Sequence, residues 1–420
     1  MTTNLGTEKI WGVVVVGGGP AGMMAAGRAG ELGKKVLLLE KNAGLGKKLL
    51  ITGGGRCNLT NNKPNIRNLL AKYKGNNKFL FSCFSQYAVS ETLEFFHLQN
   101  MPTKEEAEER VFPLSNTAQS VWDALTKYIK NSKVKIQTSC LVTDILQNCE
   151  TKIFIIKLKN GKEILTKSCI LATGGNSHPE TGSTGEGFLW LKKFGHKIIE
   201  NNFSLVPVAL KDTWAKKLGG VSLKDIKLTT FQNGQKQEVQ TGKMLFTHFG
   251  ISGPAVLNMS KGVGDLLMYG DVQIVLDLFP SLDPGQLKQK VNGLFASQSK
   301  KLMKNTLSQL ISSALVSPVL ELSGVSGEDI NHNITKENRA KLIQTIKNIP
   351  LNVKGLLGSD KAVISSGGID PVEVDFKTME SKLLPNLYVV GDLLNIDRPS
   401  GGYSLQLCWT TGFVAGNSCK

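Results

Sequence analysis

The chain has 420 residues, of which 41% are hydrophobic and 20% are charged, and its formal net charge is +16. This length exceeds what one hydrophobic core usually serves, and no run approaches the roughly 20 apolar residues of a membrane span, so we expect two or three domains of a cytoplasmic protein without membrane contact. The seven cysteines are odd in number and form no Cys-x-x-Cys pair, which argues against a metal site, a redox-active dithiol and a secreted disulfide framework.

The first predicted element is a buried strand at residues 13–16, which runs into the glycine turn GGGPAG at residues 17–22. A strand, Gly-x-Gly-x-x-Gly and a helix in this order are typical of a dinucleotide-binding unit. Gly17 allows the tight turn, Gly19 lets a pyrophosphate approach the backbone, and Gly22 lets the helix pack closely on the strand. The expected cofactor contacts of this turn are Gly17, Gly19, Pro20, Ala21 and Gly22.

The second predicted strand, Lys35–Leu39, ends in Glu40, which is 18 residues past Gly22. An acidic residue at this place accepts hydrogen bonds from a ribose 2′-hydroxyl. We therefore expect Glu40 to bind the adenosine half of the cofactor. Further cofactor contacts are expected at Lys41, Lys48, Thr52, Gly54 and Val142.

Two later segments distinguish FAD from NAD. Residues 170–175 (ILATGG) resemble the strand and turn that cross the nucleotide in glutathione-reductase-like flavoproteins, and residues 387–392 (LYVVGD) resemble the late Gly-Asp strand whose acid binds the ribityl chain. A final helix is expected to start after residues 401–402, with its N-terminal amides facing the flavin pyrimidine edge, where they would stabilise reduced flavin. The expected FAD contacts here are Ala172, Thr173, Gly174, Gly391, Asp392, Gly401, Gly402 and Tyr403.

The alternation of strand, glycine-rich turn and helix stops near residue 196 and returns near residue 355. We predict an α/β fold with a Rossmann-type FAD-binding domain formed by residues 1–195 and 355–420. We interpret the segment between these two parts as an insertion in the FAD-binding domain. Short strands such as Ile226–Phe231 predict a β-rich domain over residues 196–280, and helix-start residues at Asp283 and Pro284 predict a helical domain over residues 281–354.

Five segments together resemble the BaiN-like flavoprotein family, and the resemblance covers nearly the whole chain. They are residues 49–61 (LLITGGGRCNLTN), 110–113 (RVFP), 182–187 (GSTGEG), 245–254 (LFTHFGISGP) and 399–403 (PSGGY). The resemblance implies an FAD domain interrupted by a β-rich and a helical domain. Residues 408–412 (CWTTG) depart from the family pattern, although the glycine persists.

The resemblance implies an FAD-dependent oxidoreductase that saturates a carbon–carbon double bond conjugated to a carbonyl group. It implies two substrate types, uridine in 23S ribosomal RNA, which becomes dihydrouridine, and small enones such as oxidised bile acids. NAD(P)H is the expected reductant, but the chain has no second Gly-x-Gly-x-x-Gly to bind it. The net charge of +16 favours RNA, although the charge is spread, with 19 basic and 12 acidic residues between residues 196 and 354.

Three residues are candidates for catalysis. His248 lies in a glycine-rich loop and could donate the proton, and the thiol of Cys57 is the alternative donor. Arg56 is a candidate to bind an anion or the substrate carbonyl. For both proton donors a purely structural role is the competing interpretation, and His178 is interpreted as a turn residue.

Two other kinds of function remain open from the sequence. The chain could be a flavin-containing RNA-binding or assembly factor without turnover, against which Glu40, Asp392 and Gly402 speak. It could also be an oxidase of small amines, which oxygen consumption would reveal.

Overall fold

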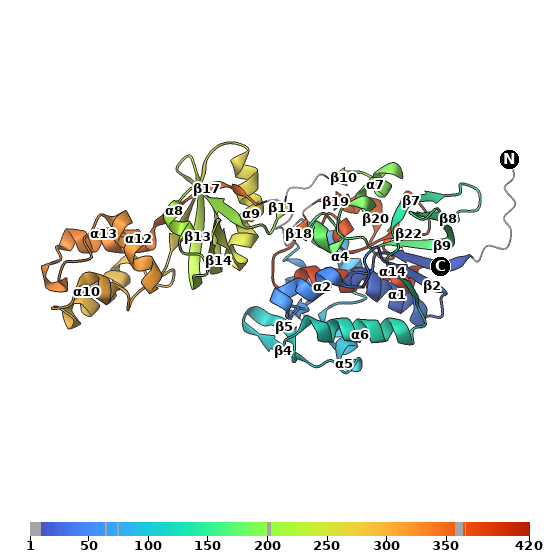
Figure 1. Cartoon of the computed structure of the whole chain (residues 1–420), viewed down its shortest axis with the longest axis horizontal. Coiled ribbons are helices and arrows are strands. Elements are labelled where there is room, and N and C mark those ends of the chain that lie inside the picture. The colour runs from blue at the N-terminus through green and yellow to red at the C-terminus, as the bar shows by residue number, and fades with distance from the viewer. Residues whose placement is uncertain (1–9, 64, 74, 200–202, 358–363, 366) are drawn as a thin grey trace. The chain divides into compact units, whose positions relative to one another are not determined.

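The computed structural model describes residues 10–63, 65–73, 75–199, 203–357, 364–365 and 367–420. The chain divides into two compact units (Figure 1). The first unit is formed by residues 1–202 and 363–420, and the second by residues 203–362. The second unit is therefore an insertion in the first.

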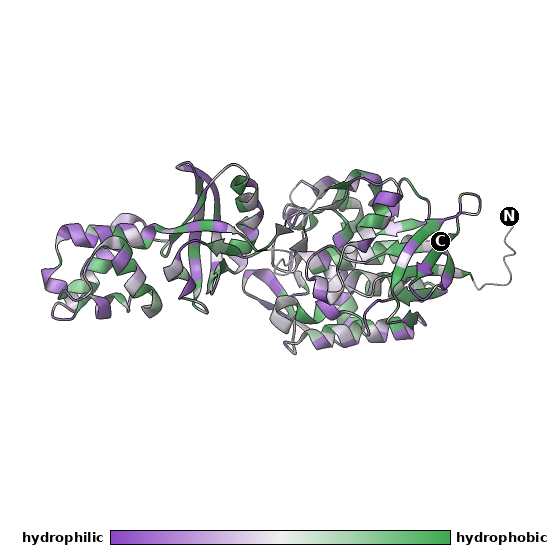
Figure 2. Ribbon diagram, turned by 45° about the horizontal axis from the view of Figure 1, so that its top comes forward, coloured by the Kyte–Doolittle hydropathy of each residue, from purple (hydrophilic) through white to green (hydrophobic). Residues whose placement is uncertain are grey.

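Among the described residues, the first unit is built on a nine-stranded sheet whose centre is parallel, in the order β22-β9-β1-β2-β6. Strand β1 is buried from Val13 to Val16, as β-branched residues are in a parallel strand covered on both faces. Figure 2 shows the hydrophobic colour along these strands. The central strands are β1 (Trp11–Val16), β2 (Val36–Leu39), β6 (Lys135–Gln137), β9 (Glu163–Leu171) and β22 (Leu387–Val389).

Antiparallel strands extend this sheet at β9 and at β22, and smaller sheets lie beside it. The additional strands of the main sheet are β7 (Val142–Gln147), β8 (Phe154–Leu158), β20 (Val374–Asp375) and β21 (Glu380–Ser381). A three-stranded sheet contains β3 (Thr60–Asn61), β4 (Thr103–Glu106) and β5 (Arg110–Pro113), and β10 (Ile198–Ile199) pairs with β19 (Gly368–Ile369). Two further short strands are β11 (Phe203–Ser204) and β18 (Ile364–Ser365).

Helices α1 and α14 pack closely because glycines face the partner backbone. A Cβ on Gly412 of α14 would lie 2.4 Å from the carbonyl oxygen of Ala21, and one on Gly416 would lie 2.4 Å from that of Ala25. This contact explains why residue 412 is a glycine. The helices of the first unit are α1 (Pro20–Glu31), α2 (Lys47–Ile51), α3 (Ile66–Leu70), α4 (Asn77–Phe84), α5 (Val89–Leu98), α6 (Ala118–Asn131), α7 (Glu186–Lys193) and α14 (Tyr403–Ser418).

The second unit contains a closed six-stranded barrel in the order β12-β15-β14-β13-β16-β17. Its core is apolar and includes Phe246, Ile274 and Leu351. The barrel strands are β12 (Val208–Leu210), β13 (Ser222–Gln232), β14 (Gln235–Thr247), β15 (Gly250–Ser252), β16 (Val272–Asp277) and β17 (Ile349–Leu356), and its helices are α8 (Thr213–Lys216) and α9 (Pro254–Leu267).

A helical part is inserted between β16 and β17. Its first helix begins at Pro284, and the carboxylate of Asp283 accepts a hydrogen bond from the backbone amide of Gln286 at 2.8 Å. The helix start predicted from these two residues is confirmed. The helices of this part are α10 (Pro284–Ser297), α11 (Met303–Leu307), α12 (Ser313–Ser323) and α13 (Lys336–Lys347).

Residues 349–354 differ from the sequence expectation, which placed them in the helical domain. They belong to strand β17 of the barrel. Ile349, Leu351 and Val353 are buried, and the residues between them are more exposed. This alternation has the period of two that a strand with one buried face requires.

No helix in the described part of the chain is both long and apolar enough to cross a membrane.

Candidate functional site

Four neighbouring strands of the first unit bring the predicted cofactor residues to one edge of the sheet. Glu40 follows β2, Gly17 follows β1, Ala172 follows β9, and Gly391 follows β22 by two residues. These strands are parallel neighbours, so their carboxyl ends meet at the same edge. In open α/β sheets ligands bind at this edge. The structure therefore brings together segments that lie far apart in the sequence.

The three motif glycines are required for different reasons. A Cβ on Gly17 would lie 2.4 Å from the carbonyl oxygen of Ala172, and one on Gly22 would lie 1.9 Å from that of Gly17. Both glycines are thus explained by the protein's own packing. Gly19 is not, because its φ is −77° and a Cβ there would meet no atom within 4 Å in the described part of the chain beyond its own neighbours. A ligand that approaches this backbone accounts for the third glycine, as the pyrophosphate of FAD would.

Glu40 is held in place by the turn that it faces. One of its carboxylate oxygens accepts a hydrogen bond from the amide of Gly18 at 2.7 Å, and the other accepts one from the amide of Asn42 at 2.8 Å. The amide of Cys140 donates to the carbonyl of Glu40 at 2.9 Å, which brings the following strand, beginning at Val142, to the end of β2. The carboxylate predicted to bind the ribose is therefore oriented before any ligand arrives.

Residues 172–174 follow β9, directly beside the glycine turn. The hydroxyl of Thr173 is buried and has no hydrogen-bond partner among the described residues. Leaving a buried hydroxyl unbonded costs roughly 1–3 kcal/mol, so this atom fits a site whose partner is supplied by a ligand. Gly174 has a φ of +74°, and a Cβ there would lie 2.9 Å from the hydroxyl of Ser183.

Asp392 lies among cations. Lys48 approaches it at 3.7 Å, and the guanidinium of Arg398 forms an ion pair with its other oxygen. Burial acts to raise the pKa of Asp392, but the charges of Arg398 and Lys48 and their hydrogen bonds outweigh it and lower the pKa. The ammonium of Lys48 also donates to the carbonyl of Ser177 at 3.3 Å. The aspartate is therefore ionised and anchored.

Helix α14 begins at the glycine pair after this aspartate. A Cβ on Gly402 would lie 2.3 Å from the backbone of Thr60, and Gly402 has a φ of +98°. The helix has no side-chain cap and no acidic residue in its first turn, so its N-terminal amides carry uncompensated partial positive charge. The carbonyl of Tyr403 accepts a hydrogen bond from the hydroxyl of Tyr73 at 2.9 Å, and burial raises the pKa of Tyr403 to about 12.

Three other predicted contacts are Lys41, which follows Glu40, and Thr52 and Gly54, which follow α2. The ammonium of Lys41 donates to Thr184 at 2.5 Å and to Glu186 at 2.7 Å, which ties it to the 182–187 segment. The hydroxyl of Thr52 donates to the carbonyl of Leu49 at 2.7 Å. Gly54 has a φ of +68° and open space around its Cβ position.

The two catalytic candidates of the first unit, Cys57 and Arg56, both have contacts within the protein. The thiol of Cys57 is buried, and this burial raises its pKa to about 12 despite a hydrogen bond with Thr52. The guanidinium of Arg56 pairs with Glu106, donates to Asn116 at 2.7 Å and lies 4.1 Å over the ring of Phe112. Cys57 therefore has the surroundings of a packed side chain, and Arg56 those of a loop anchor whose side chain is 37% exposed.

His248 belongs to the second unit, whereas the residues described above belong to the first. It occupies the two-residue turn between β14 and β15, where Thr247 pairs with Gly250. Its side chain is exposed, and its ring meets that of Phe249 edge-on at 4.9 Å. His178 has a φ of +54° and contacts Glu180 at 2.8 Å.

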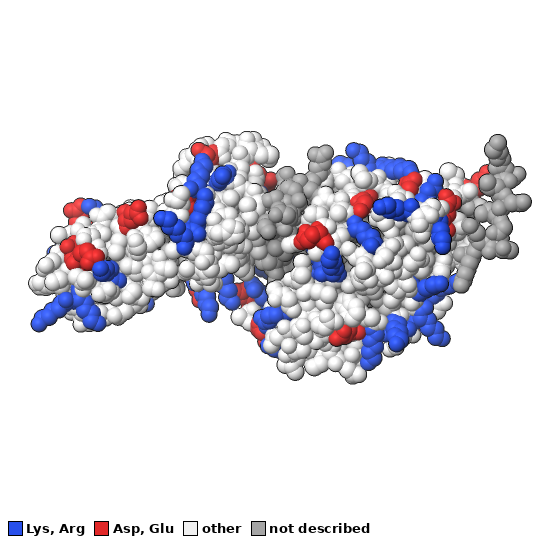
Figure 3. All heavy atoms as spheres, viewed as in Figure 1, with Lys and Arg blue, Asp and Glu red and all other residues white. Residues whose placement is uncertain are grey.

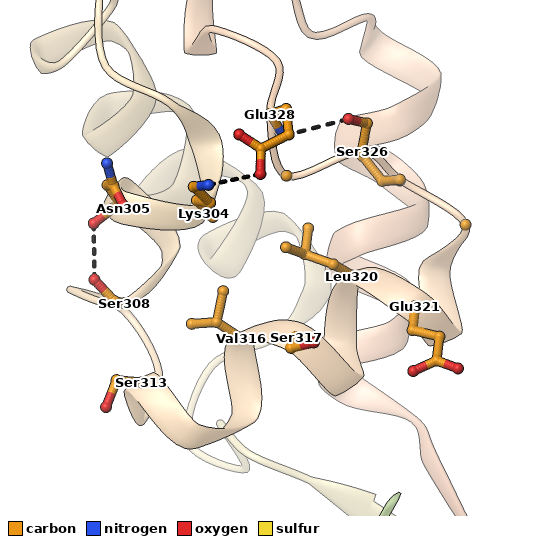
Figure 4. Close-up of a pocket in the computed structure, with 13 residues that line it drawn as sticks. Lys304, Asn305, Ser308, Ser313, Val316, Ser317, Leu320, Glu321, Ser326 and Glu328 are labelled. Atoms are coloured by element: carbon orange, nitrogen blue, oxygen red, sulfur yellow. Dashed lines mark hydrogen bonds and ion pairs between the residues drawn. The ribbon is translucent and has the colours of Figure 1, made fainter.

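A separate cleft of about 740 Å³ lies in the helical part, where α11 and α12 face the segment after α12 (Figure 4). Its lining is rich in hydroxyl groups, and its one lysine, Lys304, donates to Glu328 at 2.6 Å. With Glu321 also at the rim, the cleft carries no excess positive charge. It is therefore distinct in character from a polyanion site.

The sequence interpretation missed Arg398 and Ser177, which hold Asp392 and Lys48. A signal for Arg398 was present, since it is the one basic residue between the Gly-Asp strand and the final glycine pair. Nothing in the sequence marks Ser177.

Comparison with known proteins places this geometry in a family. The sequence model described as the HI0933-like protein Rossmann domain matches residues 11–418. The chain belongs to this family. The resemblance inferred from the sequence segments is thereby confirmed.

Two curated relatives match over almost their whole length. The chain is 30% identical over 96% of its length to a 3-dehydro-bile acid delta(4,6)-reductase of Clostridium scindens, of which 98% is covered. It is 28% identical over 96% of its length to a ribosomal RNA dihydrouridine synthase of Haemophilus influenzae, of which 96% is covered.

Among solved structures, the chain resembles a 3-ketosteroid delta1-dehydrogenase of Sterolibacterium denitrificans with a TM-score of 0.54 and 13% identity, covering 97% of this chain and 99% of that one. This likeness is one of fold. Together with the family match it confirms a Rossmann-type FAD-binding domain and an FAD-dependent oxidoreductase.

Proposed function

We propose that this oxidoreductase reduces a carbon–carbon double bond conjugated to a carbonyl group, and that its substrate is uridine in 23S ribosomal RNA. In the balanced reaction, uridine, NAD(P)H and one proton give dihydrouridine and NAD(P)⁺. A hydride equivalent adds to C6 and a proton to C5. The names of both curated relatives support a reduction of this kind.

The observation that carries the choice of RNA is the set of unpaired lysines in the second unit. Residues 203–362 contain 19 basic and 12 acidic residues. Figure 3 shows lysine and arginine side chains over the barrel and the helical part. Among the described residues, the exposed lysines of this unit without an ion-pair partner are Lys217, Lys224, Lys236, Lys288, Lys290, Lys300, Lys301, Lys336 and Lys354. Phosphate groups that neutralise such lysines release counterions, which favours binding.

The first unit supplies the redox site. FAD, when bound, supplies the hydride-transfer chemistry. The Gly17–Gly22 turn and Glu40 would hold its pyrophosphate and ribose, and Asp392 its ribityl chain. The remaining FAD contacts would come from residues 172–174 and from the start of α14, with NAD(P)H as the reductant.

The exposed imidazole of His248 is our proposed proton donor. A group that protonates substrate carbon must reach the substrate, and His248 is exposed, whereas Cys57 has no exposed surface. An RNA substrate also implies that the enzyme acts in the cytoplasm, where ribosomes are assembled.

A small enone of the bile-acid type is the second candidate, favoured by the match to the Clostridium scindens reductase. Such a molecule makes at most one ionic contact, so it gives no account of the unpaired lysines.

The proposal is tested by mass-spectrometric mapping of dihydrouridine in 23S ribosomal RNA from cells that lack the gene. We expect one dihydrouridine to be missing and to return when the wild-type gene is restored. A Gly19→Val gene is the matched control and should not restore it. An unchanged dihydrouridine pattern in the deletion strain would contradict the proposal.

A further inference from the structure

Arg398 makes three contacts around the cofactor edge. Its guanidinium forms an ion pair with Asp392, donates to the carbonyl of Ile396 at 2.7 Å, and donates to the hydroxyl of Ser404 at 3.0 Å. Ser404 lies in the first turn of α14. One side chain therefore connects the aspartate after β22 to the start of the last helix.

The side chains of Arg398, Asp392 and Lys48 are buried to different extents. The side chain of Arg398 is 0% exposed, whereas Asp392 is 16% exposed and Lys48 is 22% exposed. Arg398 thus lies behind the carboxylate, and Asp392 and Lys48 present the accessible surface. A charge at this depth is weakly screened by water, so its field extends further than that of a surface arginine.

The three charged side chains of this ion-pair group sum to a positive value. Lys48 and Arg398 contribute two positive charges and Asp392 one negative charge. The uncapped N-terminus of α14 adds partial positive charge. The reduction of FAD by two electrons and one proton gives a form with negative charge near N1, which nearby positive charge stabilises.

We propose that Arg398 is a positioning residue that raises the reduction potential of bound FAD. It does so by holding a fixed positive charge behind Asp392 and against the first turn of α14. The alternative is that Arg398 only stabilises the fold and that its charge has no effect on the flavin. Only the first role predicts opposite shifts of the reduction potential when Arg398 or Asp392 loses its charge.

The experiment measures the two-electron reduction potential of the purified FAD-loaded protein, by slow enzymatic reduction against a reference dye. Arg398→Gln should shift the equilibrium at least tenfold toward oxidised FAD, which is about 30 mV for a two-electron couple. Asp392→Asn, which leaves Arg398 in place and removes the negative charge, should shift it in the opposite direction. Arg398→Lys should restore most of the wild-type potential.

Arg28→Gln is the matched control. Arg28 donates to Asn417 at the other end of α14, at 3.0 and 2.8 Å, and forms an ion pair with Glu31 at 2.8 Å. Its replacement should lower the melting temperature and leave the potential unchanged.

An unchanged or raised potential in Arg398→Gln overturns the proposal, and so does an unchanged or lowered potential in Asp392→Asn. If Arg398→Gln is purified without FAD, the direction of the Asp392→Asn shift decides. The measurement uses no RNA and no enone, so its outcome is independent of whether the proposed substrate is right.

Discussion

The cofactor turn of the first unit and the His248 turn of the second unit are both glycine-containing connections, but they are determined in different ways. The first is surrounded by backbone, with Gly17 against Ala172 and Gly22 against Gly17. In the second, His248 is exposed and Phe249 is partly buried, and their rings meet edge-on at 4.9 Å. Because packing restricts the residue types in the first turn, that turn can be recognised from the sequence. The role of His248 in the second turn depends on the molecule that binds there, which the sequence does not indicate.

The sharpest way to test the first half of this comparison is Gly22→Ala. The new methyl group would lie 1.9 Å from the carbonyl oxygen of Gly17, so strand β1 and helix α1 must separate. We expect the free energy of unfolding to fall by at least about 3 kcal/mol, the upper range for overpacking, as measured by urea denaturation. Gly44→Ala, where a Cβ would meet nothing within 4 Å, is the control and should be neutral. Equal stability of the two variants would show that the packing account is mistaken.

Gly19→Val separates cofactor binding from folding. Apart from its chain neighbours, no described residue has an atom within 4 Å of the Cβ position, so the apoprotein should lose no more than about 1 kcal/mol, through the weaker N-cap preference of valine. FAD retention should be lost, because the side chain enters the space of the pyrophosphate. Absorbance of the purified protein and its reconstitution with FAD check this. Normal FAD retention in the folded variant would remove the strongest support for the cofactor site.

Substitutions at the two proton-donor candidates test the second half of the comparison. His248→Ala should lower turnover at least about tenfold, since general acids contribute typically about 10² or more, while FAD stays bound and is reduced by NAD(P)H at the normal rate. Cys57→Ala should instead lower the melting temperature and leave turnover nearly unchanged, because its thiol is buried. Stopped-flow reduction and steady-state assays distinguish these results. The reverse pattern would transfer the donor role to Cys57.

The smallest effect is expected from charge reversal in the helical part. Lys300 and Lys301 are exposed and have no ion-pair partner among the described residues, whereas Lys304 is neutralised by Glu328. The double variant Lys300→Glu and Lys301→Glu should raise the KM for RNA several-fold and reduce the salt slope by about 0.7 for each phosphate that is no longer neutralised. Lys304→Gln is the control and should change the KM much less. Equal changes of the KM in both variants would mean that RNA binding depends on the overall charge of the protein and not on Lys300 and Lys301 in particular.

The glycine turn and the place of Glu40 after β2 could be predicted because both are determined locally. The spacing from Gly17 to Glu40 lies within one strand-helix-strand unit, and steric requirements leave few residue types at each place. The position of Asp392 after a strand could also be predicted, although it lies far along the chain, because that strand has a recognisable end. The carboxyl ends of four neighbouring strands then bring these segments together.

The rest could not be predicted because it depends on contacts between distant residues. The loop anchors of Arg56, namely Glu106 and Asn116, and the pairing of Arg398 with Asp392 involve side chains that the sequence does not connect. The end of the helical part was placed too late, because β17 closes a barrel whose other strands lie more than 70 residues earlier. Burial of Cys57 likewise became visible only in the folded chain.

The most direct test of the proposed reaction is to incubate the protein and NAD(P)H with protein-free 23S ribosomal RNA from the deletion strain, in parallel with a small enone, at low and moderate salt. We predict one new dihydrouridine, detected by mass spectrometry, with activity on RNA that falls steeply with salt while activity on any enone does not. RNA left untouched at every salt concentration, together with efficient saturation of the enone, would contradict the RNA substrate and identify a small-molecule reductase.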